Sequence, residues 1–541
     1  MAVAVVAGLV AGLAIAGWLG PNSRQMSHLV RGGLAGVGIA LAWVGFAATR
    51  VADLQLRERI TRAQWVGLAF VCVLAAFNYF QFDRKVLFGI NDYTDTAYYY
   101  TNSKYLGELG YDGLYAGALV CDVERGAPRT KHIEQIRDLR DDELRTKAEE
   151  LEHGAQVKAN FTPERWSAFC HDITFFLDRL SRESLETNFF VDHGYNPPPT
   201  WTVVGGALCE LVSVEQLKWI CSVDTALVIA MFGVVFWAFG FEPTAFALLF
   251  YLVTFSGRWP ILGMAILRFD WVVGLTVGVA LLKRGWYGSA GVALAYAALN
   301  RVFPALFFWG WLVEALIDTV RERRLLPKHV RLAAAAAVTT VVLSGTALVE
   351  YGPTTVVDSV YSLRLHNESF SSHRVGLGTV LVWQGETTKE EIRAHGGMRA
   401  KELKVQATKW WLRGFGVAAC VAIGAIAWLL DRLGRPASAW EMVAWVTWPL
   451  FCATTPQVNY YNFRTVSHLW HSAFPAAAVH TVLLSLLLAT EAAAQVAQWS
   501  DWERHAVNAV SSCGMLAYFL VMVGSLVARV SAAARERSAG G

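Results

Sequence analysis

The chain has 541 residues, of which 55% are hydrophobic, and its formal net charge is only +3 at pH 7. Such a composition excludes a water-soluble globular protein, which would not tolerate so much apolar helix. The weak positive charge, with no basic stripe and interleaved aromatic residues, argues against nucleic-acid binding. We therefore expect an all-α integral membrane protein.

Apolar runs of about 20 residues, the length that a membrane-spanning helix needs, recur along the chain. The long runs are 1–19, 27–49, 63–81, 219–239, 332–350, 409–431, 467–490 and 505–530. Shorter or interrupted runs are 243–257, 266–282, 287–299, 302–318 and 439–455. Together they predict a polytopic bundle of about 11 to 13 spans. The first run lacks a basic n-region, and a second run follows closely, so we interpret it as a retained span rather than a signal peptide.

The longest polar segment, 82–200, divides the chain and holds 21 of its 44 Asp and Glu residues against 14 Lys and Arg residues. We expect it to form a large helical loop outside the membrane. The predicted regions are N-terminal spans (1–81), this acidic loop (82–200), central spans (201–350), a second outward loop (351–407), and C-terminal spans with a basic tail (408–541).

Clusters of basic residues set the expected orientation, because such clusters in short connections mark the cytoplasmic side. One cluster spans 50–62 and another spans 321–331. The 82–200 and 351–407 loops and the short connection at 455–466 then face outward, into the periplasm or exterior of a bacterial-type inner (plasma) membrane. The basic tail at 529–537 conflicts with this count, which indicates that one span is misassigned.

Within the acidic loop, 131–153 combines helical spacing with dense alternating charge, which predicts a solvated helix. Residues 163–190 carry apolar side chains at helical spacing, which predicts an amphipathic helix on the membrane or on the loop's own core. Three prolines at 197–199 stop any helix and force an extended turn. Cys121 and Cys170 leave two interpretations open, a disulfide or two free thiols.

The acidic loop opens with the stretch NDYTDTAYYY, which sets two carboxylates where the chain leaves the membrane. Asp92 and Asp95 are placed to meet a lipid-borne substrate at its headgroup. The alternative is that both cap the following helix, since Asp is favoured at helix starts. Tyr98 and Tyr99 suit stacking against a sugar, or belong to an interfacial aromatic belt.

These features resemble the GT-C superfamily of glycosyltransferases, membrane enzymes that take sugar from a polyprenyl-phosphate donor. The resemblance is strongest to the bacterial polyprenol-phosphate-mannose-dependent branch, and it covers roughly residues 65–490. Asp95 followed by Tyr98 and Tyr99, and then GYDGLY with Tyr115, resembles that branch's acidic motif. The stretch YNPPPTWTVVGGAL with Tyr195, and GVALAYAALNRVFPALFF with Arg301, resemble two later elements.

The resemblance implies a GT-C-like helical bundle that transfers mannose, or another hexose or pentose, with inversion. The donor is a polyprenyl-phosphate sugar, and the acceptor is a lipid, a glycan or a protein. Such a transfer needs a carboxylate that accepts the proton of the acceptor hydroxyl, for which we expect Asp95. Asp92 is expected to help or to bind the acceptor.

The transfer also needs positive charge where the lipid phosphate departs. Candidates for this donor site are Arg301, Arg464, Arg374 and His373. Arg268 is expected to pair with Asp270 or to extend toward the membrane interface instead.

Candidates for contact with the sugar or the acceptor are Tyr98, Tyr99, Tyr195, Tyr460 and His468. His468 and His471 share a helix face, but no carboxylate lies near them in the sequence. We assign no metal site and expect no cofactor, with a divalent metal left open. The expected partners are the lipid-linked sugar, its acceptor and membrane lipids.

Two other classes of function remain open from the sequence. A transporter or flippase of lipid-linked substrates also has many spans and buried charges, although no internal repeat of hydropathy is visible. The second of these classes is a non-catalytic membrane scaffold whose loop binds partners. A transferase should not tolerate Asn at the catalytic carboxylate, whereas a transporter or a scaffold should.

Overall fold

The computed structural model describes residues 2–19, 23–81, 89–90, 92–126, 128–257, 265–368 and 370–540. Within these ranges nearly all regular structure is helical, and the strands form one two-stranded sheet. The expected loop opening at 82–88 and Asn91 lie outside the described residues, as do residues 258–264 of the central region. An all-α membrane architecture is therefore confirmed for the described part of the chain.

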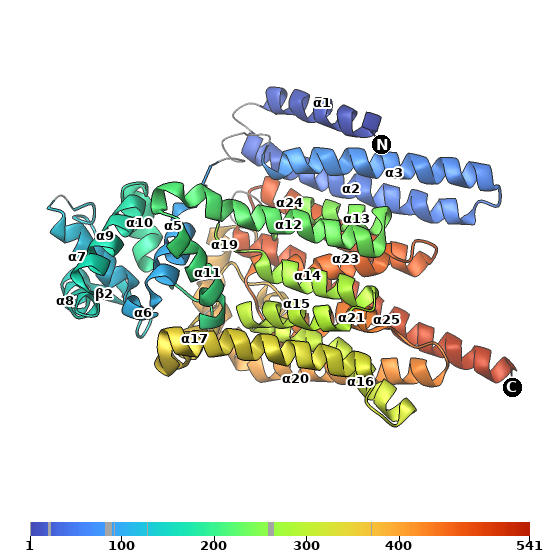
Figure 1. Cartoon of the computed structure of the whole chain (residues 1–541). Coiled ribbons are helices and arrows are strands. Elements are labelled where there is room, and N and C mark those ends of the chain that lie inside the picture. Colours follow the sequence, from blue (N-terminus) through green and yellow to red (C-terminus); the bar gives the residue numbers. More distant parts are fainter. Residues whose placement is uncertain are drawn as a thin grey trace.

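The N-terminal region contributes three helices that pack together on one flank of the bundle (Figure 1). They are α1 (Ala2–Leu19), α2 (Ser23–Arg50) and α3 (Leu54–Tyr79). Asp53 caps α3, because its carboxylate accepts the backbone N–H groups of Gln55 and Leu56. Helix α2 also packs along α24, so the N-terminal region lies against the C-terminal region of the chain.

The acidic loop folds as a module at one end of the bundle, on the left in Figure 1. Its elements are α5 (Tyr93–Ala97), the π-helix η2 (Tyr98–Asn102), α6 (Leu106–Leu109), α7 (Leu114–Glu124), β1 (Gln135–Asp138), β2 (Glu143–Thr146), α8 (Lys147–Lys158), α9 (Pro163–Leu177), α10 (Arg182–Thr187) and the 3-10 helix η3 (Phe189–Val191). We call these residues, 92–198, the outer module.

The helix predicted for 131–153 is wrong in its first half, where the chain forms the antiparallel hairpin β1–β2. Ile136 and Asp138 alternate toward the inside of the module, which is the period of a strand rather than of a helix. Asp142 turns the hairpin at a φ of 67°. Helix α8 then starts at a capping box, in which Thr146 and Glu149 satisfy each other's backbone N–H groups.

The amphipathic segment 163–190 forms α9 and the shorter α10 rather than one helix. The apolar face of α9, with Trp166, Phe169 and Phe176, is buried among other rings of the module. A disulfide between Cys121 and Cys170 joins α7 to α9. Of the alternatives left open, the structure therefore supports packing on the loop's own core and a disulfide.

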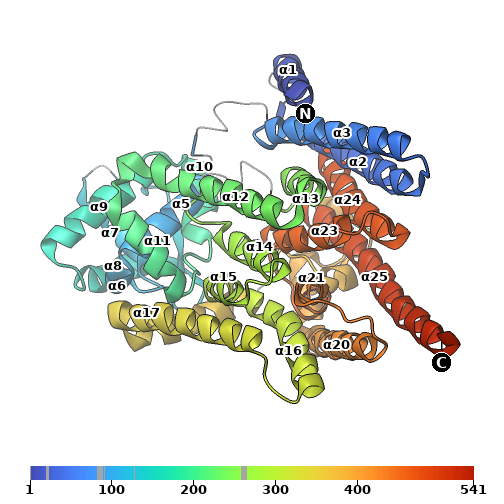
Figure 2. The ribbon, with the colours of Figure 1, turned by 45° about the vertical axis from the view of Figure 1, so that its right-hand side comes forward.

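The rest of the chain forms the bundle. Its elements are α11 (Pro199–Leu211), η4 (Val214–Gln216), α12 (Leu217–Phe239), α13 (Phe241–Val253), α14 (Asp270–Lys283), α15 (Tyr287–Asn300), η5 (Phe303–Phe307), α16 (Phe308–Glu322), α17 (Pro327–Glu368), α18 (Leu377–Val382), α19 (Lys389–Ala394), α20 (Gly397–Arg432), α21 (Ala439–Trp445), α22 (Thr447–Ala453), η6 (Val458–Arg464), α23 (Thr465–Ser472), α24 (Ala478–Trp499) and α25 (Arg504–Gly540). Figure 2 shows α14 and α15 between α12 and α17, as their contacts also indicate.

Among the described residues, eight helices are long and apolar enough to cross a membrane. This finding confirms a multi-pass membrane protein, but with fewer full-length spans than the 11 to 13 expected. Helices α13, α14 and α15 have only 13, 14 and 14 residues. The apolar run 467–490 is also broken between α23 and α24, where Pro475 cannot continue a helix.

The predicted second loop, 351–407, is largely helical. Helix α17 continues through a kink at Gly352, which has a φ of 81°, and Pro353 follows it. Helix α20 begins at Gly397, before the predicted end of the loop. The predicted connection at 455–466 is mostly the 3-10 helix η6, and its last residues are buried.

The basic clusters and the C-terminal tail lie at the end of the bundle opposite the outer module (Figures 1 and 2). Arg321 at the end of α16 is 2.8 Å from Asp431 at the end of α20. Arg435, just beyond α20, is 2.9 Å from Glu536 in the last turns of α25. The tail therefore sits with the other basic clusters, and the conflict in the predicted count of spans disappears.

Candidate active site

Asp92 and Asp95 stand at the start of the outer module, where the chain enters α5. Asp92 is the N-cap of this helix, and its Oδ1 accepts the backbone N–H of Asp95 at 3.0 Å. Helix α5 has five residues and runs directly into the π-helix η2, a form that is frequent at functional sites. Asp92 therefore caps the helix, as one alternative predicted. The side chain of Asp95 does not cap it and is available to another partner.

The Asp95 carboxylate faces a guanidinium from the bundle. Its Oδ2 lies 3.3 Å from Nε of Arg268, and 20% of the side chain remains exposed. Burial raises the pKa of Asp95 to about 6, although the charge of Arg268 opposes the rise, and Asp92 and Asp192 add to it. Asp95 is thus a partly accessible carboxylate with a pKa that burial shifts upward, which suits a group that accepts a proton.

Arg268 was expected to pair with Asp270, and this expectation is wrong. Asp270 accepts hydrogen bonds from Tyr296 at 3.1 Å and from Asn300 at 2.9 Å instead. Asp224 of α12 accepts the backbone N–H of Arg268 at 3.1 Å, which fixes the residue at the start of α14. The guanidinium of Arg268 can therefore reach the outer module.

Tyr99 joins Arg268 to Arg301. Its hydroxyl accepts a hydrogen bond from Nη1 of Arg268 and another from Nη2 of Arg301, the latter at 3.2 Å. The ring is held edge-on by Tyr195 and Trp201, with ring centroids 6.0 Å and 5.2 Å away. Asp95, Arg268, Tyr99 and Arg301 consequently form one continuous polar chain between the module and the bundle.

A cavity of about 390 Å³ begins at the end of this chain, because Arg301 also lines it. Its lining includes four cationic residues, Arg301, Arg374, Lys409 and Arg413, and no described lining residue is acidic. Apolar side chains form much of the remaining wall, namely Pro198, Val302, Phe303, Leu363, Phe370, Val405, Leu412, Ala453 and Pro456. The other lining residues are polar and uncharged, namely Asn196, Gln406, Thr454, Thr455, Gln457 and Tyr460. The cavity thus suits an anion that carries an apolar group.

Two of the predicted phosphate ligands, Arg301 and Arg374, meet in this cavity. Arg374 is 4% exposed, and its Nη1 donates to the carbonyl of Thr455 at 3.2 Å. His373 is adjacent in sequence but does not line the cavity, since its Nε2 lies 2.6 Å from Nη1 of Arg504. The structure therefore brings together two of the four predicted cations.

Arg464 does not line this cavity, contrary to expectation. Its Nη1 lies 2.5 Å from Oε1 of Glu491, and both side chains are fully buried. His468 lies beside it, stacked on Phe250 with ring centroids 3.9 Å apart, and its Nδ1 is 2.9 Å from the carbonyl of Arg464. The counter-charge, Glu491, belongs to α24, so the sequence around Arg464 does not reveal this pairing.

The predicted sugar-binding tyrosines separate into two groups. Tyr460 lines the cavity, and Tyr99 contacts Arg301 at its edge. Tyr98 belongs to the core of the module, where it stacks on Phe189 and donates to its carbonyl at 2.9 Å. Tyr195 is 1% exposed and its hydroxyl is 2.7 Å from that of Thr202. Of these tyrosines, Tyr460 lines the cavity, whereas the buried Tyr99 is linked to it only through Arg301.

Lys409 and Arg413 line the cavity but were not among the predicted site residues. They lie four residues apart on α20, so they share one helix face. Between them, Trp410 and Trp411 are 76% and 74% exposed, as residues at a membrane interface often are. A basic pair at this spacing, beside tryptophans at the start of an apolar run, is the signal that identifies them.

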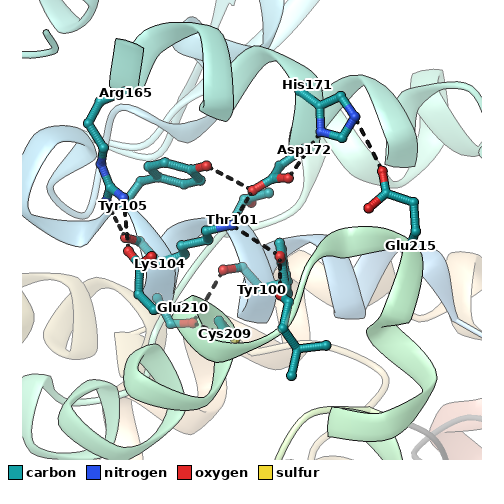
Figure 3. A network of polar contacts seen from close by, with 12 residues as sticks. Tyr100, Thr101, Lys104, Tyr105, Arg165, His171, Asp172, Cys209, Glu210 and Glu215 are labelled. Atoms are coloured by element: carbon teal, nitrogen blue, oxygen red, sulfur yellow. Dashed lines mark hydrogen bonds and ion pairs between the residues drawn. The ribbon is translucent and has the colours of Figure 1, made fainter.

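A polar network fixes the π-helix that carries Tyr99 (Figure 3). Nζ of Lys104 and the hydroxyl of Tyr105 each lie 2.8 Å from Oδ2 of Asp172 on α9. Arg165, also on α9, lies 2.9 Å from Glu210 on α11. The network therefore ties the segment after Tyr99 both to the module and to the first helix of the bundle.

Comparisons of the chain with models of known protein families, with curated proteins and with solved structures found no match.

Proposed function

We propose that this protein is an integral membrane glycosyltransferase of the GT-C type. It moves a sugar from a polyprenyl-phosphate donor to a lipid, glycan or protein acceptor, with inversion, on the outward face of a bacterial-type inner membrane. The observation that carries the proposal is that Arg301 belongs both to the polar chain from Asp95 and to the cationic cavity. A carboxylate is therefore linked, through Arg268 and Tyr99, to a cavity that suits an anion.

In the proposed reaction, the carboxylate of Asp95 acts on the acceptor, and the arginines of the cavity act on the donor phosphate. Asp95 accepts the proton of the acceptor hydroxyl while the hydroxyl oxygen forms a bond to the anomeric carbon. The bond from that carbon to the phosphate oxygen breaks, and its electron pair leaves with the lipid phosphate. Arg301 and Arg374 stabilise the charge that develops on this phosphate.

Tyr99 and Arg268 act as positioning residues in this proposal. Arg268 holds the Asp95 carboxylate, and the Tyr99 hydroxyl links Arg268 to Arg301. The distance between base and phosphate site is thus set by side chains that contact one another. The apolar wall of the cavity suits the first part of the prenyl chain.

The position of the site supports the proposed outward orientation. The outer module lies at the end of the bundle opposite the basic clusters, and basic clusters favour the cytoplasmic side. The disulfide between Cys121 and Cys170 belongs to an oxidising compartment. Both features favour a site on the periplasmic or exterior face.

The experiment that tests this function presents a set of radiolabelled polyprenyl-phosphate sugars to membranes that contain the protein. A transferase yields label covalently bound to an acceptor, together with free polyprenyl phosphate, at levels above membranes without the protein. Translocation of intact donor without cleavage would support the flippase alternative instead. Neither product nor translocation with any hexose or pentose donor would leave the scaffold alternative.

A further inference from the structure

A cluster of potential metal ligands lies in the outer module, on elements that the proposed active site does not use. Single ligand atoms of Asp138, Glu150 and His153 all lie within 4.8 Å of one another. Glu150 and His153 are three residues apart on α8 and so share one face, and β1, which carries Asp138, packs against this helix. Nε2 of His153 is 3.8 Å from Oδ2 of a fourth residue, Asp112.

Two atoms of this cluster are buried without a hydrogen-bond partner among the described residues, Oε1 of Glu150 and Nδ1 of His153. Glu150 is 1% exposed and His153 is 7% exposed. The nearest approach between them, Nδ1 to Oε2, is 3.5 Å, which is too long for a good hydrogen bond. Unpaired buried polar atoms cost free energy, so their convergence points to a ligand.

The charges around the cluster fit a divalent cation. Asp112, Asp138 and Glu150 supply three negative charges. Arg140 supplies one positive charge, because its Nε lies 2.9 Å from Oδ1 of Asp138 and its Nη2 lies 2.8 Å from Oδ2, so both oxygens of this carboxylate also accept from the guanidinium. Arg145 reaches Asp138 only at 3.5 Å and forms a closer pair with the carboxylate four residues before it. Three negative charges less one leave two, which a divalent ion neutralises.

We propose that Asp138, Glu150 and Nδ1 of His153 bind one divalent transition-metal ion such as Zn²⁺, while the carboxylate of Asp112 orients the other imidazole nitrogen of His153. An imidazole nitrogen together with carboxylate oxygens is a ligand set that Zn²⁺ accepts, whereas Ca²⁺ and Mg²⁺ prefer oxygen alone. The side chain of Asp112 is 40% exposed, so an ion can reach the site from solvent.

A metal at this site has a structural role. It joins the β1–β2 hairpin to α8, and Asp112 in the turn between α6 and α7 lies beside the same imidazole. Binding to the folded state but not to the unfolded chain stabilises the module. The proposal does not depend on the glycosyltransferase function, since none of these residues belongs to the polar chain or the cavity.

The test uses the full-length protein in detergent, stripped with EDTA and then titrated with Zn²⁺ by calorimetry. One Zn²⁺ per chain is expected, bound more tightly than Ca²⁺ under the same conditions, and it should raise the unfolding temperature. Glu150→Gln and His153→Gln should each weaken Zn²⁺ binding by at least about tenfold. Glu152→Gln, on the exposed face of the same helix, should bind like the unmodified protein.

Gel filtration of each variant separates loss of a ligand from misfolding, because only variants that elute like the unmodified protein are compared. Absence of Zn²⁺ binding by the unmodified protein would overturn the proposal. So would equal affinity in Glu150→Gln and His153→Gln. Loss of binding in His329→Gln, with His153→Gln unaffected, would move the metal to the Glu314, Asp318 and His329 cluster at the other end of the bundle, and would equally overturn it.

Discussion

Arg464 and Arg301 are both buried, and both were expected to bind the donor phosphate, yet their surroundings differ. Arg464 has a fully buried carboxylate, Glu491, at 2.5 Å. Arg301 lines a cavity whose other charged lining residues are all cationic. A buried charge in a membrane protein is a functional hypothesis by default. The comparison teaches that a buried arginine paired with a buried carboxylate has a structural role, whereas a buried arginine that lines a cationic cavity is placed to bind an anionic ligand.

The largest expected effect is on stability, from the variant Glu491→Gln. It leaves the Arg464 guanidinium buried without its counter-charge, which typically costs about 3 to 5 kcal/mol. We expect a large loss of folded protein in detergent, measured as yield and unfolding temperature by gel filtration after heating. An unfolding temperature equal to that of the unmodified protein would contradict the structural role of the pair.

The matching variant at the other arginine, Arg301→Ala, should affect the reaction rather than the fold. A hydrogen bond to a charged group contributes about 1.5 to 3 kcal/mol, so kcat/KM for the donor should fall by about 10- to 150-fold. Transfer rates across donor concentrations measure this effect, with unfolding temperature as the control. An unchanged dependence on donor concentration would remove Arg301 from the phosphate site.

The pH dependence of transfer sharpens the assignment of Asp95. Its pKa is raised to about 6 by burial, and only the ionised form accepts a proton. The rate should therefore fall about tenfold per pH unit below 6 and level off above it. A carboxyl with a raised pKa makes folding less favourable as pH rises between about 4 and 6, so Asp95 itself does not increase the amount of folded protein over this range, and the rate is expressed per amount of folded protein at each pH. A flat profile from pH 5 to 8 would contradict the assignment.

The smallest effect is expected at the side of the cavity formed by α20. Lys409 is only partly buried, and exposed charge pairs contribute about 0.2 to 1 kcal/mol. Lys409→Ala should thus reduce kcat/KM for the donor by about 1.4- to fivefold. The control, Lys404→Ala, removes an exposed lysine from the same helix outside the cavity lining and should have no effect. Equal losses in both variants would indicate general attraction to the membrane surface.

The fold could be predicted from the sequence only to the level of its hydrophobic runs. Runs of about 20 apolar residues identify helices in a membrane because the bilayer demands that length. The shorter runs 243–257 and 266–282 correspond to α13 and α14, but these helices are short and are buried by neighbouring helices along most of their length, so hydropathy does not show whether they cross the membrane. The hairpin at 135–146 was missed because its alternating charges resemble a solvated helix, while Ile136 and Asp138 follow the period of a strand.

The candidate site could be predicted where its residues follow one another in a motif. Asp95 and Tyr99 share one such stretch, and Arg301 interrupts an apolar run. The partners could not be predicted, because Arg268 contacts Asp95 across 173 positions and Arg464 pairs with a residue of a later helix. Hydrogen bonds and ion pairs of this kind depend on packing between helices, which local composition does not contain.

The most direct test of the account compares Asp95→Asn with the unmodified protein, using whichever polyprenyl-phosphate sugar the latter accepts. The initial rate of label transfer and the binding of donor are measured on the same membranes. The amide keeps the size of the carboxylate but removes its basicity, so transfer should fall by about 100- to 10,000-fold while donor binding survives. Asp92→Asn should lose less, since its side-chain oxygen still accepts the Asp95 N–H. Full transfer in Asp95→Asn would contradict the central claim, and full transfer in both variants would contradict the glycosyltransferase proposal itself.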